Sequence, residues 1–174
     1  MDTELVEQFK DAACRKLEQD ISQIARCAAL LSDEQAWWRP NEHCNSVANL
    51  ALHLAGNIRQ WIVAGLGGEA FARDRPAEFA ARGPQPLAPI VAELLRVVER
   101  ARSIISNMDA ASLSRRYGVQ GYDVSGLQAI FHVAEHISFH SGQIVHITKT
   151  IRDVDLSLYD AQGRRRTPAG GKPW

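Results

Sequence analysis

Three histidines have the residue type and spacing that suit metal chemistry: His53 in NLALHLAGN, and His136 and His140 in EHISFHSGQ. On an α-helix His136 and His140 lie about 40° and about one turn apart, so both imidazoles can reach one ion. If the helix that carries His53 lies alongside, the three side chains form the ligand set of a divalent metal with open coordination positions. The pattern predicts a metal site at His53, His136 and His140.

The ligand set indicates which reactions such a site would support. Three neutral imidazoles leave the charge of a divalent ion uncompensated, so the ion stays a strong Lewis acid. It would lower the pKa of a bound water toward about 7 for hydrolysis, or hold a thiol as a thiolate nucleophile for transfer. Imidazole suits zinc and nickel, so we expect one divalent ion per chain, zinc or nickel. The alternative is a cluster of hydrogen-bonded core histidines that bind no metal.

The other histidines fit the same point less well. His132 lies one turn before His136 and is expected beside the ligands, whereas His43 and His146 are expected to lie apart from them. Three polar residues are candidates to orient a ligand or a bound water, with an exposed, solvated role as the alternative for each: Asn57, Glu135 and Gln143.

Spacing argues against other metal classes. No glutamate stands three residues before any histidine, so the Glu-x-x-His pairs of di-iron bundles are absent. The HExxH motif of zinc proteases is absent too. Cys44 precedes His53 by more than two helical turns, and we expect it to be a buried structural thiol rather than a fourth ligand.

Helical periodicity accounts for most of the chain and strand alternation for almost none of it. Apolar residues recur in steps of three and four over residues 5–31, 47–64, 87–108 and 126–152, and Ser46 and Ser125 are good N-caps for the second and fourth stripes. A capped short turn is expected from Ser32, and a loop or small hairpin between Tyr117 and Tyr122. The sequence predicts an all-α four-helix bundle.

Residues 65–86 form a connection that is longer than bundles normally use and that is expected to help cover the site. Arg73 and Arg75 in it are interpreted as charges in water, with carboxylate binding at the mouth of the site as the alternative. Three tryptophans are expected to pack in the core, with the lining of a substrate pocket as the alternative: Trp37, Trp38 and Trp61.

Length and charge limit the partners. The 174 residues fit one domain, predicted as 1–155, followed by a poorly ordered tail, 156–174. Twenty basic residues balance 20 acidic ones, so neither nucleic acid nor membrane binding is expected, the short run Arg164-Arg165-Arg166 included. With no legible signal peptide, no long apolar run and an odd number of cysteines, we expect a cytoplasmic protein that binds a small molecule.

Three segments resemble the DinB/YfiT-like family of bacterial four-helix bundles: NLALHLAGNIRQWIVAGLGG, RDRPAEF and HVAEHISFHSGQIVHITK. The resemblance covers nearly the whole chain. It implies an up-down-down-up bundle, frequent homodimers, metal ligands at His53, His136 and His140, and kinship with metal-dependent transferases that use thiols such as mycothiol or bacillithiol. Many relatives have an arginine after the last ligand, where this chain has Ser141.

Together these patterns predict a metal-dependent enzyme that activates a low-molecular-weight thiol for transfer, or a water for hydrolysis. The alternative is a non-catalytic bundle in which metal or histidines support the fold, a dimer or a stress-related role. The two differ at the metal, because a structural zinc is closed by a fourth protein ligand and a catalytic one keeps a position open. No general base is assigned.

Overall fold

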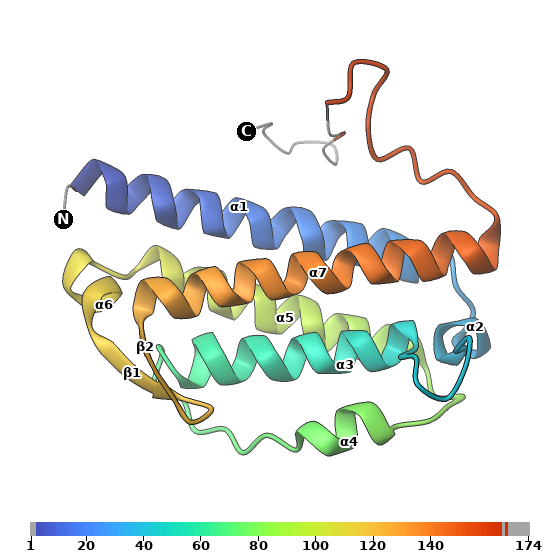
Figure 1. Ribbon diagram of the computed structural model, residues 1–174, viewed down its shortest axis with the longest axis horizontal. Helices are drawn as coiled ribbons and strands as arrows, with labels where there is room; N and C mark the ends of the chain where they lie inside the picture. Colours follow the sequence, from blue (N-terminus) through green and yellow to red (C-terminus); the bar gives the residue numbers. More distant parts are fainter. Residues whose placement is uncertain (1–2, 165, 167–174) are drawn as a thin grey trace.

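Four long helices lie side by side and form the body of the molecule (Figure 1). The computed structural model describes residues 3–164 and 166. The long helices are α1 (Thr3–Ala28), α3 (Val47–Ile58), α5 (Leu87–Ser106) and α7 (Gly126–Arg152). In Figure 1, α1 and α7 run in one direction and α3 and α5 in the other. This arrangement makes the all-α bundle predicted from the periodicity.

Side-chain caps fix where two of these helices begin. Ser46 accepts a hydrogen bond from the backbone N–H of Asn49, and Ser125 does the same for Gln128. In each case the amide side chain at the third helical position returns a bond to the N–H of the serine, which completes a capping box. Both predicted N-caps are confirmed, and they set the register of the helices that carry the histidines.

Six short elements connect the long helices. They are α2 (Asp33–Trp37), the π-helical turn η1 (Arg59–Ala64), α4 (Arg75–Ala80), α6 (Ala110–Ser114), and the strands β1 (Arg116–Val119) and β2 (Tyr122–Ser125). The strands form an antiparallel hairpin whose two turn residues, Gln120 and Gly121, have φ of 53° and 82°. A turn with two positive φ values matches the twist of a tight hairpin, and glycine takes such a value at little cost. The capped turn at Ser32 and the small hairpin are therefore both present.

The core lies between the four long helices. α1 and α3 each pack against both α5 and α7, so the apolar stripes of all four helices meet inside. Fully buried members include Leu17, Leu54, Leu94 and Ile137. Burying each such side chain contributes about 1.5–3 kcal/mol, and this packing holds α3 and α7 at a fixed distance.

Three expectations about the elements need correction: the end of one helix, and two short helices that were not predicted. α1 ends at Ala28 rather than Leu31, because the backbone turns there and the next helix starts from the Ser32 cap. The long connection contains α4, and the segment before the hairpin contains α6; neither helix was predicted. Both begin at an aspartate cap, Asp74 or Asp109, and are too short to show an apolar stripe.

The predicted tail, 156–174, falls partly outside the described residues, which omit 165 and 167–174. Within the described part Leu156 is buried, and its carbonyl accepts a hydrogen bond from Arg26 of α1. The poor order of the tail stays a prediction, whereas packing against the core extends into its first residues, through buried Leu156 and partly buried Leu158.

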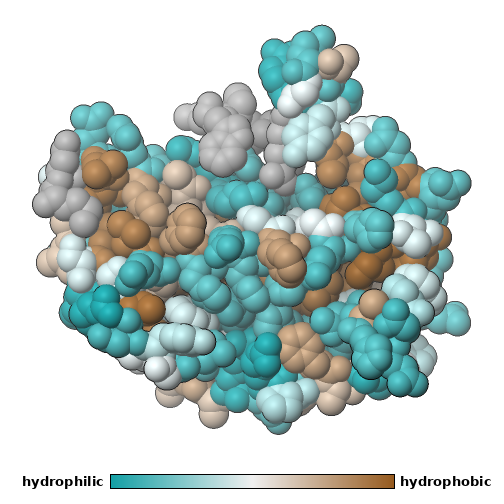
Figure 2. Space-filling model, in the orientation of Figure 1, coloured by the Kyte–Doolittle hydropathy of each residue, from teal (hydrophilic) through white to brown (hydrophobic). Residues whose placement is uncertain are grey.

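On the face of the molecule shown in Figure 2, hydrophilic and hydrophobic areas alternate. In the part of the chain that the structure describes, no helix is long and apolar enough to cross a membrane.

Candidate metal centre

Three imidazoles from two helices converge between α3 and α7. One ring nitrogen from each of His53, His136 and His140 lies within 4.8 Å of the others. The Nε2 atoms of His53 and His136 are 2.9 Å apart. The ring centroid of His140 is 5.1 Å from that of His53 and 4.5 Å from that of His136. The structure thus brings together the three residues selected from the sequence.

Helix geometry explains the convergence. His53 follows the buried line of α3 and is 4% exposed, between Leu50 and Leu54. On α7, His136 and His140 lie on either side of buried Ile137, and His140 is 8% exposed. Because α3 packs against α7, the i, i+4 pair of one helix faces the single histidine of the other.

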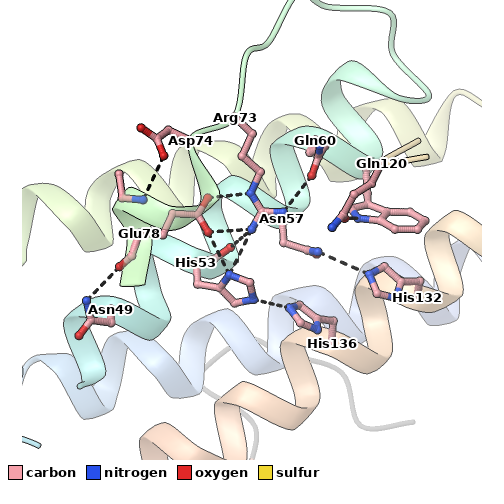
Figure 3. A network of polar contacts seen from close by, with 12 residues as sticks. Asn49, His53, Asn57, Gln60, Arg73, Asp74, Glu78, Gln120, His132 and His136 are labelled. Atoms are coloured by element: carbon pink, nitrogen blue, oxygen red, sulfur yellow. Dashed lines mark hydrogen bonds and ion pairs between the residues drawn. The ribbon is translucent and has the colours of Figure 1, made fainter. Parts of the chain in front are cut away.

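Glu78 of α4 orients His53 (Figure 3). Its Oε2 lies 3.0 Å from His53 Nδ1, and the Glu78 side chain is only 11% exposed. An ionised carboxylate only accepts hydrogen bonds, so His53 Nδ1 carries the proton and Nε2 presents its lone pair toward His136. A carboxylate behind a histidine is the usual support of a metal ligand.

Arg73 holds Glu78 in place. Its Nε and Nη2 atoms donate to the two oxygens of Glu78 at 2.7 and 2.8 Å, and Nη1 donates to Gln60. Arg73 Nη2 also lies 3.1 Å from His53 Nδ1, but two donors cannot bond each other, so its proton goes to Glu78 and the carbonyl of His53. The expectation that Arg73 is a charge in water is wrong, because its side chain is paired with Glu78 and only 4% exposed.

A glycine makes room for this carboxylate. A Cβ on Gly56 of α3 would lie 2.0 Å from Glu78 Oε1 and 3.0 Å from Arg73 Nε. Both distances are too short for ordinary contact, so any larger residue would displace the pair. Gly56 therefore permits the close approach of α4 to α3.

His140 has a weaker partner. Its Nδ1 lies 2.7 Å from Oε1 of Gln143, an exposed residue one turn further along α7. If the Gln143 oxygen accepts the Nδ1 proton, His140 Nε2 is free in the same way as that of His53. The sequence left open whether Gln143 orients a histidine or is solvated, and the structure shows both features: Gln143 contacts His140 and is exposed.

The surroundings favour neutral imidazoles on α7. Burial lowers the pKa of His132, His136 and His140. The pKa of His136 falls to about 3, first through burial and then because protonated neighbours at His140, His53 and His132 would repel a positive charge there. A neutral imidazole with an available lone pair is the form that binds metal ions.

Glu78 has the opposite tendency. Burial alone would raise the pKa of its carboxyl, but the hydrogen bonds from His53 and Arg73 outweigh burial and lower the pKa below its ordinary value. The carboxylate is therefore ionised at neutral pH and adds a negative charge behind His53.

A hollow of about 430 Å³ opens beside His53 and His136. Trp61 of η1, Tyr122 of β2 and His132 of α7 contribute to its wall. Its volume lies in the range of small-molecule sites, and it lies next to the imidazoles. Ligands bound in the hollow would be in reach of an ion held by the three histidines.

The remaining sequence candidates lie around this centre. His132 lies beside the cluster as expected, with its Nε2 3.4 Å from Asn57 Nδ2 and its ring 4.1 Å from that of Trp61. Asn57 contacts His132 rather than one of the three converging histidines, and Glu135 is exposed.

Two expectations about aromatic and thiol residues change. Trp61 is buried as predicted and also lines the hollow, whereas Trp38 is exposed instead of packed in the core. Cys44 is only partly buried, against the prediction of a buried thiol, and lies with His43 and His146 at a second hollow.

The sequence analysis did not identify two residues that contact His53, Glu78 and Phe79. The ring centroid of Phe79 lies 4.6 Å from that of His53. Both come from α4, which has no apolar stripe. Two sequence features could have indicated them. Asp74 and Pro76 are typical of the start of a helix, and Gly56 inside α3 indicates that another segment packs closely against that helix.

Comparisons with known proteins agree with the observed fold. A family model described as "Protein of unknown function (DUF1572)" matches residues 4–161. No curated protein matches the chain.

Solved structures share the fold at low sequence identity. A conserved protein from Enterococcus faecalis superimposes with a TM-score of 0.71 at 16% identity, over 83% of this chain and 97% of that one. A DinB-like protein from Bacillus cereus gives 0.64 at 14% identity, over 82% and 90%. The DinB-like YjoA of Bacillus subtilis gives 0.64 at 14% identity, over 83% and 95%.

Proposed function

The chain belongs to the DUF1572 family and has a DinB-like fold, and we propose that it is a metal-dependent enzyme with one divalent ion bound by His53, His136 and His140. The observation that carries the proposal is the convergence of three imidazoles beside an open hollow. Two of them have an acceptor at Nδ1 that directs Nε2 toward the common point.

The donor set fits such an ion. Two imidazole nitrogens bound to one tetrahedral zinc at about 2.0–2.1 Å are separated by roughly 3.3 Å. The Nε2 atoms of His53 and His136, at 2.9 Å, need only a small side-chain adjustment to reach that separation. Imidazole favours zinc and nickel, and we propose one of these two.

The ion would act as a Lewis acid that favours the deprotonated form of a thiol or a water. The residues of the chain supply the rest. Glu78 and Gln143 hold the tautomers of His53 and His140, and the hollow admits a small molecule beside them. We propose a low-molecular-weight thiol as cosubstrate for group transfer, with activation of water for hydrolysis as the second reaction.

The alternative is a bundle in which the ion only supports the fold or a dimer. A structural zinc needs a fourth protein ligand. Among the described residues no further His, Cys, Asp or Glu side chain joins the group of three. This arrangement supports the enzyme over the structural site.

Elemental analysis of the purified, untagged protein tests the proposal. We expect about one zinc or nickel per chain, and its loss in His53→Ala and His136→Ala. The loaded protein is then screened with thiols and with hydrolysable esters, beside the same protein after chelation. No bound metal, even after incubation with zinc or nickel, would contradict the proposal.

We also propose a homodimer, as the sequence resemblance implies. Phe131 and Phe139, two residues on α7, are 62% and 63% exposed. These two exposed aromatic side chains of one helix are candidates for a contact surface. Light scattering on the wild type and on Phe131→Ser/Phe139→Ser tests this, and a monomeric wild type would contradict it.

The three unpaired cysteines fit the reducing cytoplasm predicted from the sequence.

A further inference from the structure

The hollow beside the three histidines has one wall made of aromatic rings. Tyr122 stacks on Trp61 with 6.1 Å between centroids and a 30° interplanar angle. The Trp61 ring lies 4.1 Å from His132, which stacks on His136 at 5.4 Å. The rings form a continuous row from the exposed hairpin to a ligand histidine. A flat, apolar group would bury its face against this row.

The charged groups at the hollow are cationic. Two arginines, Arg73 and Arg75, line it, and none of its described lining residues is a carboxylate. Arg73 is already neutralised by Glu78. Arg75 is exposed, lies over the ring of Phe79 at 4.9 Å, and forms no ion pair with any described carboxylate. Arg75 is therefore available to an anion that enters the hollow.

One buried acceptor at the hollow has no partner. The Oδ1 atom of Asn57 is buried and accepts no hydrogen bond from the described part of the protein, although Asn57 Nδ2 contacts His132. Asn57 lines the hollow, so a small turn of its side chain would bring this unsatisfied acceptor to a donor on a bound molecule. Asn57 lies one helical turn after His53, so this donor would lie near the proposed ion.

We propose that the hollow binds a small aromatic carboxylate that carries a hydrogen-bond donor. Its carboxylate pairs with Arg75, its ring lies along Tyr122, Trp61 and His132, and its donor bonds Asn57 Oδ1. This inference names the substrate class of the metal centre and rests on the proposed function for the reaction, but not for the binding.

The probe is 4-hydroxybenzoate, titrated calorimetrically into zinc-loaded and zinc-free protein. Three analogues each remove one feature: 4-hydroxybenzamide lacks the charge, benzoate lacks the donor, and 4-hydroxycyclohexanecarboxylate lacks the flat ring. We expect 4-hydroxybenzoate to bind both forms of the protein, about tenfold more tightly than the amide, as one charge-assisted contact provides. The other two analogues should bind more weakly than 4-hydroxybenzoate.

Variants assign the contacts. Arg75→Gln should weaken 4-hydroxybenzoate about tenfold and abolish the preference over the amide, and Tyr122→Ser should weaken all flat ligands. Arg96→Gln is the matched control, because Arg96 is an exposed arginine of α5 outside the hollow, and it should bind as the wild type does. Neither Arg75 nor Tyr122 is needed for the core, so both variants should fold.

Three results would overturn the inference: no binding of the acid, equal affinity for acid and amide, or binding that needs zinc and ignores Arg75→Gln. In the last case the carboxylate would bind the metal itself. Zinc content measured on the same samples separates the two proposals. Bound zinc without recognition of the acid removes only the substrate class, and recognition without bound zinc removes only the metal-dependent reaction.

Discussion

Two regions of the molecule collect histidines, and only one of them has the arrangement of a metal centre. At the first, His53, His136 and His140 are directed at one point. At the second, His43 and His146 line a hollow of about 520 Å³ together with Cys44. Both regions have soft or nitrogen ligands and open space, so residue type alone does not distinguish them.

What differs is burial and support. His53 and His140 are buried, and each has an acceptor at Nδ1. His43 and His146 are exposed, and neither side chain has a hydrogen bond to another described residue. An exposed imidazole loses rotamer freedom when it binds an ion, whereas a held one has lost it on folding. Orientation by neighbours, rather than the number of histidines, makes the first region a candidate site.

The largest effect is expected when one histidine of each region is replaced and the zinc affinities of the two variants are compared. His140→Ala should reduce zinc affinity by more than the roughly 100-fold that loss of a supporting residue can cost, because a ligand itself is removed. His146→Ala, six residues further along α7, should leave affinity unchanged. Competition with a chelator of known affinity measures the zinc affinity of both variants. Equal losses of affinity would contradict the assignment of the metal centre to the first region.

The second effect concerns the support of His53. Glu78→Gln should weaken zinc binding about 10–100-fold, because the charge behind His53 is lost. Leaving Arg73 buried without its carboxylate should also destabilise the fold, by up to about 3–5 kcal/mol. Glu93→Gln, which removes a more exposed partner of Arg59, is the control.

Gly56→Ala tests the same support without changing a charge. Its Cβ would displace Glu78 from His53, so zinc affinity should fall in the same direction as in Glu78→Gln. Chelator competition on a folded variant, judged by circular dichroism, is the measurement. Wild-type affinity in Gly56→Ala would mean that Glu78 does not orient His53.

A smaller effect is expected from Gln143, which adjoins both regions. It bonds His140 and lines the second hollow, but it is exposed to water. Water can replace its oxygen at Nδ1, so Gln143→Leu should reduce zinc affinity less than about tenfold. A loss as large as that of Glu78→Gln would show that burial of the supporting group matters little.

The smallest effect is expected on acid stability of the chelated protein. His136 has an ordinary pKa of 6.5 when unfolded and about 3 when folded, so below pH 6.5 the unfolded state binds the extra proton. Stability should therefore fall as the pH drops from about 6.5 toward 3. His136→Asn should reduce the loss of Tm between pH 7 and 6 by about 1–3 °C, and His43→Asn should not. Identical pH profiles would contradict the buried, neutral state of His136.

The long helices and the three clustered histidines could be predicted from the sequence, because both depend on local periodicity. Buried Leu50, Leu54 and Ile137 mark the inner faces, and His53, His136 and His140 lie beside them. The sequence did not predict whether His53 lies level with His136 and His140 along the bundle axis, because the spacing within one helix does not fix its axial offset from another helix. The resemblance to a known family supplied that offset, and the structure agrees with it.

The supports of the site were harder to predict. Glu78 lies 25 residues from His53 in the chain, on a six-residue helix without an apolar stripe. Its position depends on a tertiary contact that Gly56 permits and Arg73 stabilises. The π-helical turn that carries Trp61 has no recognised sequence signal, although such turns are frequent at functional sites.

X-ray absorption spectroscopy on the zinc-loaded protein tests the central claim most directly, because it identifies the atoms around the ion. The account predicts three imidazole nitrogens at about 2.0–2.1 Å and one further light atom from solvent, which is displaced when a thiol is added and replaced by sulfur at about 2.3 Å. A sulfur ligand already present without added thiol, or four imidazoles, would show a closed structural site and contradict the open trihistidine centre.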